Sequence, residues 1–174
     1  MPGGDLWELW EGELREVPGA GGWASGIAVR IASRLTLFVE AEHAGWVTGA
    51  DGAFVLARDP DTVVEPDVGF VRWDRLPDRA PPVKYIPVAP DLAVEVQSPS
   101  DEPGEMARKR ELYRRAGVPL QWWVDPIRRT VAAYRDGEPV ADLGDGVDLD
   151  GGGVLPGFRL PIATVFASAP KPIR

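Results

Sequence analysis

Hydrophobic and polar residues alternate in several short segments, and this alternation predicts β-strands. Residues 6–17 form two alternating runs around Glu11 and Gly12, which predicts a β-hairpin. The segments 46–48 and 54–57 flank the sequence Gly-Ala-Asp-Gly and predict a second hairpin. Further apolar or alternating runs predict strands at residues 68–73, 91–97, 120–124, 130–134 and 155–160.

Two segments have the spacing of amphipathic helices. After Ser25, a residue typical of a helix N-cap, apolar residues recur every three or four positions and predict a helix to about residue 42. A second helix is predicted over residues 102–116 and ends at Gly117. The strand, helix and strand over 91–124 predict a βαβ crossover. We therefore expect one α/β domain over residues 1–174, with a mixed sheet flanked by helices and an N-terminal β-hairpin.

Three segments show neither pattern. Residues 76–90 are rich in proline and are predicted to be irregular. Residues 136–150 contain six acidic residues and no basic one, and they are predicted to form an acidic loop. Residues 162–166 predict a final turn.

Composition restricts the chemistry that the chain can perform. Cysteine is absent and His43 is the only histidine, which excludes disulfides, thiol nucleophiles and thiolate zinc sites. A metal site would therefore hold a hard cation such as Mg²⁺ or Mn²⁺. Asparagine is absent and arginine outnumbers lysine 16 to 3, a composition typical of thermophiles and also of GC-rich genomes. Because no apolar run approaches ~18 residues and the first residues lack a secretion-signal pattern, we expect a cytoplasmic protein with no membrane partner.

Charge is unevenly distributed along the chain. The net charge of −8 argues against a protein that coats nucleic acid non-specifically. Residues 106–115 nevertheless carry a local charge of +4 from Arg108, Lys109, Arg110, Arg114 and Arg115 against Glu111. This basic run is either a solvated helix face, a contact for the DNA backbone, or part of a subunit interface.

Candidate catalytic residues converge around the predicted crossover. Asp67 opens a strand, Glu95 and Gln97 point the same way from another strand, and Lys109 and Tyr113 share a helix face. Two carboxylates can hold a divalent cation that activates phosphoryl transfer, and a nearby cation can offset the developing charge. The residues alone leave other interpretations open, because Asp67 could form a turn, Lys109 could be solvated and Tyr113 could be a core residue.

Four motifs, in this order and spacing, resemble the Uma-two-type restriction endonuclease family of the PD-(D/E)XK nuclease superfamily. They are Pro66–Asp67, DLAVEVQSPSD (91–101), Lys109-x-x-x-Tyr113 and AGVPLQWWVDP (116–126). The similarity extends from the hairpin at 6–17 to LPGFRLP near the end. The resemblance implies a restriction-endonuclease-like fold and Mg²⁺-dependent cleavage of DNA, with Mn²⁺ as a substitute metal.

The resemblance also implies a metal site. Asp67 and Glu95 would be the metal ligands, and the carbonyl of Val96 would complete the inner shell. Glu16, before the first predicted helix, is a further candidate carboxylate for this site.

Three other positions take catalytic roles by the same resemblance. Gln97 stands where the superfamily pattern usually has a lysine. Lys109 is then a migrated lysine whose ammonium group reaches the site from the following helix. Tyr113 would lie near the substrate phosphate or act as a packing residue.

Two other functions remain open from the sequence, as does the state of assembly. The protein could retain the nuclease fold as a non-catalytic homo-oligomeric or DNA-binding protein, and a glycosidase with paired carboxylates would need neither Lys109 nor the basic run. Several of the seven tryptophans lie in or near short peripheral elements, namely Trp7, Trp10, Trp23 and Trp46. Because so many aromatic residues are hard to bury in one small core, we expect a homodimer or higher homo-oligomer.

Overall fold

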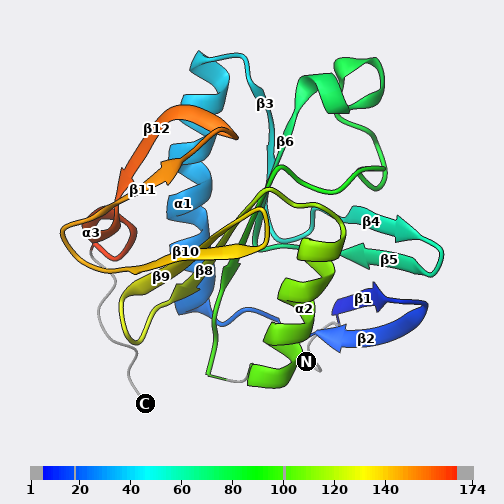
Figure 1. The fold of residues 1–174 in the computed structure, drawn as a ribbon, viewed down its shortest axis with the longest axis horizontal. Helices are drawn as coiled ribbons and strands as arrows, with labels where there is room; N and C mark the ends of the chain where they lie inside the picture. The colour runs from blue at the N-terminus through cyan, green and yellow to red at the C-terminus, as the bar shows by residue number, and fades with distance from the viewer. Residues whose placement is uncertain (1–5, 18, 100, 168–174) are drawn as a thin grey trace.

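A six-stranded mixed sheet lies at the centre of the computed structural model, which describes residues 6–17, 19–99 and 101–167 (Figure 1). Its strand order is β10-β9-β8-β7-β6-β3. The strands are β3 (Gly45–Thr48), β6 (Val68–Arg72), β7 (Leu92–Val96), β8 (Leu120–Asp125), β9 (Thr130–Arg135) and β10 (Glu138–Leu143). Strands β7 and β8 are parallel, and the other neighbours are antiparallel. The predicted mixed α/β fold is confirmed.

One face of this sheet packs against helix α1 (Gly22–Ala41). The antiparallel pair β11 (Asp148–Gly151) and β12 (Leu155–Pro161) and the short helix α3 (Ile162–Val165) complete this layer. Ile31 and Leu35 of α1 are fully buried against sheet residues such as Val94 and Trp122. The apolar stripe of α1 therefore forms the larger core.

The other face of the sheet packs against helix α2 (Pro103–Arg115) and a four-stranded sheet. This second sheet has the order β2-β1-β5-β4, and its strands appear on the right in Figure 1. They are β1 (Leu6–Trp10), β2 (Glu13–Val17), β4 (Phe54–Arg58) and β5 (Asp61–Val64). Trp10, Val64, Tyr113 and Trp123 are buried together in a smaller core between these layers.

The first hairpin and the βαβ crossover agree with the sequence. Strands β1 and β2 pair through a turn at Glu11 and Gly12, which both have positive φ (53° and 84°), as a type I′ hairpin turn requires. Strand β7, helix α2 and the parallel strand β8 form the crossover. This crossover brings α2 over the end of β7.

The predicted second hairpin is wrong. Strand β3 pairs with β6, and β4 pairs with β5, a strand that the sequence did not predict because Asp and Pro residues surround it. Gly45 permits the pairing of β3, since a Cβ there would lie 2.1 Å from the carbonyl oxygen of Val71. Strand β3 thus pairs with a strand distant in the sequence, and β4 pairs with the next strand along the chain.

Three further boundaries differ from expectation. Helix α1 begins at Gly22 with Gly21 as its N-cap, so Ser25 lies inside the helix. The acidic segment 136–150 contains β10 and part of β11, whose acidic residues lie mostly at exposed positions. The proline-rich segment contains one short 3-10 helix, Pro77–Arg79, and is otherwise irregular apart from an isolated bridge between Ile86 and Phe54; a second short 3-10 helix, Trp73–Arg75, lies just before it. None of the described helices is both long and apolar enough to cross a membrane.

Candidate active site

A cavity of about 130 Å³ lies beside the carboxyl end of β7. It is lined by residues of β1, of the segment before β6, of β7 and of α2. One lysine, Lys109, lines it together with seven acidic residues from different parts of the chain, namely Glu8, Glu65, Asp67, Glu95, Asp101, Glu102 and Glu105. Elements distant in the sequence therefore bring ionisable groups together here.

The pairing of β6 with β7 places two of these carboxylates side by side. Val68 pairs with Val94, so the antiparallel register puts Asp67 opposite Glu95. The Oδ2 atom of Asp67 accepts a hydrogen bond from the backbone N–H of Val96 at 2.7 Å. Alternation along β7 buries Val94 and Val96 against α1 and turns Glu95 toward α2.

Helix α2 supplies two partners for Glu95 from positions one turn apart. The hydroxyl group of Tyr113 donates a hydrogen bond to Oε1 of Glu95 at 2.5 Å. The Nζ atom of Lys109 lies 2.8 Å from the same oxygen. Tyr113 is fully buried and packs edge-on against Trp123, so its hydroxyl group is held in place.

Lys109 has a second carboxylate partner that the sequence analysis missed. Its Nζ atom also lies 2.8 Å from Oε1 of Glu8 and donates to the carbonyl oxygen of Glu65 at 3.4 Å. Glu8 is on β1 and its side chain is only 1% exposed. The Leu-Trp-Glu-Leu-Trp alternation placed Glu8 on the same strand face as Trp10, and this pattern was the available signal.

Burial and mutual repulsion govern the charges in the cavity. Burial raises the pKa of Glu95 to about 8, and the carboxylates of Asp67 and Glu8 add to this effect against the opposing Lys109. Burial likewise raises the pKa of Asp67, although the Val96 hydrogen bond opposes it. Burial alone would lower the pKa of Lys109, but Glu95 and Glu8 outweigh it and raise that pKa. The site thus holds more carboxylates than its single ammonium group can neutralise.

Of the remaining sequence candidates, Val96 and Gln97 line the cavity and Glu16 does not. Val96 and Gln97 line the cavity at the end of β7. Glu16 is on β2, is exposed, and is absent from the described residues that line the cavity. The carboxylate that strand β1 contributes from the same hairpin is Glu8.

The oxygen donors around the cavity fit a hard divalent cation. Among the described residues, no hydrogen bond reaches Oε2 of Glu95 or Oδ1 of Asp67, so both oxygens are available to a ligand. No group of three or more His, Cys, Asp or Glu side chains within the described ranges is arranged to hold a metal ion. Mg²⁺ commonly uses only one or two carboxylates and takes its other ligands from water and substrate phosphate. Two carboxylates beside the backbone of Val96 match that pattern.

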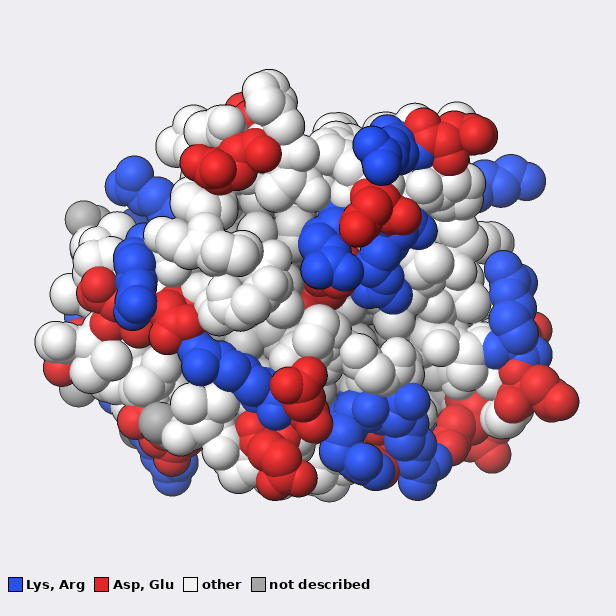
Figure 2. Space-filling model, turned by 45° about the horizontal axis from the view of Figure 1, so that its top comes forward, with Lys and Arg blue, Asp and Glu red and all other residues white. Residues whose placement is uncertain are grey.

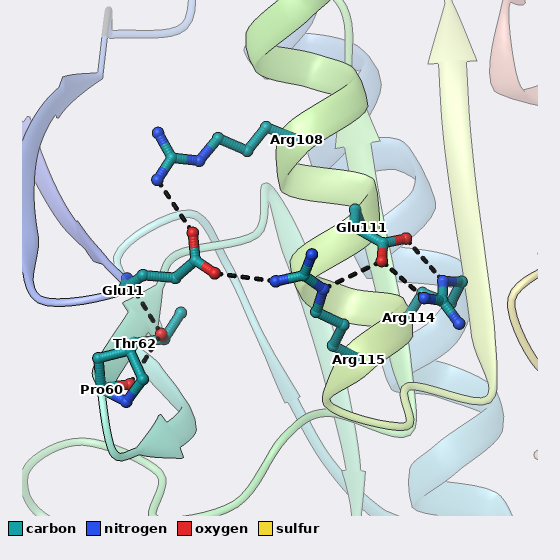
Figure 3. Close-up of polar contacts among 7 residues, drawn as sticks. All are labelled: Glu11, Pro60, Thr62, Arg108, Glu111, Arg114 and Arg115. Carbon is teal, nitrogen blue, oxygen red and sulfur yellow. Dashed lines mark hydrogen bonds and ion pairs between the residues drawn. The ribbon is translucent and has the colours of Figure 1, made fainter.

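The basic run on α2 is largely neutralised within the chain. Glu11, in the β1–β2 turn, forms ion pairs with Arg108 at 3.0 Å and Arg115 at 2.9 Å (Figure 3). Glu111 binds Arg114 and Arg115 on the helix itself. On the face shown in Figure 2, basic and acidic side chains are interspersed, with no single basic surface.

Two comparisons with known proteins bear on the family and the fold of the chain. The Uma2 family model, described as "Putative restriction endonuclease", matches residues 1–163. A crystal structure titled as a "putative nuclease belonging to DUF820" from Anabaena variabilis superposes with a TM-score of 0.82. The two chains are 19% identical, and the match covers 93% of this chain and 90% of the other. No curated protein matches the chain.

Proposed function

Because the chain belongs to the Uma2 family ("Putative restriction endonuclease"), we propose that it hydrolyses phosphodiester bonds of DNA and depends on Mg²⁺. The observation that carries the proposal is the placement of Lys109, Asp67 and Glu95 around one cavity, with the lysine ammonium group 2.8 Å from the Glu95 carboxylate. Two carboxylates and a lysine suffice for this chemistry without histidine or cysteine.

Each of these side chains has a distinct role in the proposed reaction. Asp67, Glu95 and the carbonyl of Val96 would hold the cation. When bound, Mg²⁺ supplies a Lewis acid that polarises a phosphoryl oxygen and lowers the pKa of a water molecule. Lys109 offsets the negative charge that grows on the phosphate in the transition state. Tyr113 keeps the Glu95 carboxylate in one orientation through its 2.5 Å hydrogen bond.

A second cavity indicates where the substrate backbone would run. Residues Gln97 and Ser98 line both this cavity and the first one. The second cavity continues to the β8–β9 turn, where the side chain of Arg128 is 81% exposed. Gln97 lies between the proposed metal ligands and this arginine, so we assign it to substrate contact. The DNA backbone would therefore pass from the carboxylates toward Arg128.

The test is metal-dependent cleavage by the purified protein. Supercoiled plasmid and an RNA of matched sequence are incubated with Mg²⁺, Mn²⁺ or a chelator. We expect DNA cleavage with either metal, none with chelator, and loss of cleavage in Asp67→Asn and Glu95→Gln. Glu138→Gln, an exposed substitution on β10, serves as the control and should retain activity. Cleavage that survives both site substitutions would contradict the proposal.

One observation favours the alternative of a non-catalytic DNA-binding protein. The ammonium group of Lys109 lies 2.8 Å from Glu95 and offsets part of its charge without a metal. Calorimetric titration with Mn²⁺ separates the two functions. Saturable binding that Asp67→Asn abolishes supports the nuclease, whereas DNA binding without any metal binding supports the alternative.

A further inference from the structure

We propose that Glu8 is a positioning residue that holds the ammonium group of Lys109 in the candidate active site. This inference rests on the nuclease function proposed above and assigns a role to a carboxylate outside the four motifs quoted in the sequence analysis. It is carried by one juxtaposition, in which Nζ of Lys109 lies 2.8 Å from a carboxylate oxygen of Glu8 and 2.8 Å from one of Glu95.

Glu8 is itself held rigidly by three donors. Its Oε1 atom accepts from the backbone N–H of Glu65 at 2.8 Å as well as from Lys109. Its Oε2 atom accepts from the indole N–H of Trp10 at 2.6 Å. A buried carboxylate with both oxygens engaged by charged and neutral donors has little freedom to rotate.

The same contacts distinguish Glu8 from the proposed metal ligands. Both oxygens of Glu8 already accept hydrogen bonds, whereas Glu95 and Asp67 each keep one oxygen that no described residue reaches. The side chain of Glu8 is 1% exposed, and that of Glu95 is 13% exposed. Glu8 is therefore placed to bind the lysine and Glu95 to bind a ligand from the cavity.

Two anchors for one ammonium group have a functional consequence. Glu95 is shared between Lys109, Tyr113 and the proposed cation, and a cation on Glu95 would repel the lysine. Attraction to Glu8 does not depend on Glu95, because Glu8 has its own donors on β1 and in the β5–β6 segment. Glu8 thus keeps the positive charge in the site when Glu95 is occupied.

The hairpin that carries Glu8 is fastened to α2 next to Lys109. Glu11 binds Arg108 and Arg115 (Figure 3), and the guanidinium group of Arg108 lies 5.6 Å from the ring centroid of Trp10. These contacts come from the turn after Glu8 and from the helix residues on either side of Lys109. They keep strand β1 against the helix, as a positioning role requires.

The first test measures Lys109 directly and needs no turnover. The chain has three lysines, and the exposed Lys84 provides an internal reference for amine acetylation followed by mass spectrometry. Without metal, acetylation of Lys109 relative to Lys84 should rise about tenfold in Glu8→Gln, the factor expected on losing one charge-assisted hydrogen bond. Glu13→Gln, an exposed substitution on the same hairpin, should leave the ratio unchanged. An unchanged ratio in folded Glu8→Gln would overturn the proposal.

The second test is a double-mutant cycle on cleavage. Glu8→Gln should lower kcat by about 30-fold or more while KM for DNA and the Mn²⁺ affinity change less than about threefold. In a Lys109→Met background, Glu8→Gln should cause no further loss, because it acts through the lysine. Additive losses would show a merely structural role, and loss of Mn²⁺ binding would make Glu8 a ligand; either result contradicts the proposal.

A milder variant covers the case in which Glu8→Gln does not fold. Trp10→Phe keeps an aromatic ring in the smaller core and removes the indole donor to Glu8. Like Glu8→Gln, it should raise the acetylation ratio and lower kcat, but by smaller factors. No change in either quantity would overturn the proposal. If the wild-type protein cleaves no DNA, the proposed function fails, while the acetylation ratio still decides whether Glu8 positions Lys109.

Discussion

At the scale of single residues, the metal site proposed at Glu95 predicts a dependence of metal affinity on pH. Burial raises the pKa of Glu95 to about 8, so the carboxyl group is largely protonated at pH 6 and ionised above pH 8. A metal needs the ionised form. We therefore expect Mn²⁺ affinity to rise with pH and to level off above about pH 8, with proton release below it. Calorimetry in buffers of different ionisation enthalpy measures both, and a flat profile from pH 6 to 9 would contradict this assignment.

Tyr113 provides a matched change at the same carboxylate. Tyr113→Phe removes the O–H donor to Glu95 and keeps the buried ring against Trp123. A hydrogen bond to the ionised carboxylate favours ionisation, so its loss raises the pKa of Glu95 further. The pH midpoint of Mn²⁺ binding should move upward, and stability above pH 8 should fall by about 1 kcal/mol. Tyr134→Phe is the control. Tyr134 lies on β9 with the guanidinium group of Arg110 over its ring, and its substitution should change neither the pH midpoint of Mn²⁺ binding nor the stability.

The sequence motifs identified Asp67, Glu95 and Lys109 at the cavity but missed Glu8, the second carboxylate that binds the lysine. Asp67, Glu95, Lys109 and Tyr113 belong to one crossover and the strand beside it, so spacing within the motifs places them near one another. Glu8 is a hundred residues from Lys109, and its contact depends on how the hairpin packs against α2. Such packing is determined by tertiary structure, and no local spacing encodes it.

At the scale of elements, the fold pairs basic residues of α2 with acidic side chains, which the sequence alone did not predict. The basic run suggested a DNA contact, yet Glu11 and Glu111 pair with Arg108, Arg114 and Arg115. The exposed arginine that extends the proposed substrate path is Arg128 in the β8–β9 turn. An isolated charge count therefore overstated the positive potential of the helix.

This difference gives a testable pair of substitutions. Arg128→Ala should weaken DNA binding and reduce the slope of log affinity against log salt by about 0.9, the value for one phosphate contact. Arg114→Ala, which removes a cation already paired with Glu111, should leave the slope unchanged. Fluorescence anisotropy with labelled duplex over a salt series measures both. A change in slope for Arg114→Ala alone would place DNA on the helix instead.

Strand pairing shows which elements a sequence can and cannot predict. The β1–β2 hairpin was predictable because Glu11 and Gly12 form a tight turn between alternating runs. The partner of β3 was not, because β6 lies some twenty residues further along and the pair depends on the close approach at Gly45. Local turns are encoded locally, whereas pairing across a sheet is decided by the shared core.

At the scale of the whole molecule, exposed apolar residues support the expectation of a homodimer or higher oligomer. Trp7 is 50% exposed and Leu14 is 69% exposed, and both lie on the β1–β2 hairpin. The register pairs Leu9 with Leu14, so Trp7, Leu9 and Leu14 share one face of the hairpin. An apolar face of this kind is typical of an interface between subunits.

Light scattering at micromolar concentration should give the mass of at least two chains. Leu14→Asp, on the exposed hairpin face, should shift the mass toward one chain without unfolding the protein. Val83→Asp, at a fully exposed position outside the hairpin, is the control and should leave the mass unchanged. A monomeric mass for the wild-type protein would contradict the prediction of a homodimer or higher oligomer.

The placement of Glu8 on the first described strand has a consequence for how the protein is made. Glu95 and Lys109 leave the ribosome about ninety and about a hundred residues after Glu8. During that interval the growing chain carries the Glu8 carboxylate without the lysine that binds it, so burying Glu8 would leave its charge unpaired. Joining the two requires closing a long loop, which makes their contact one of high contact order. The ionic cluster of Glu8, Glu95 and Lys109 therefore cannot form until helix α2 has been synthesised.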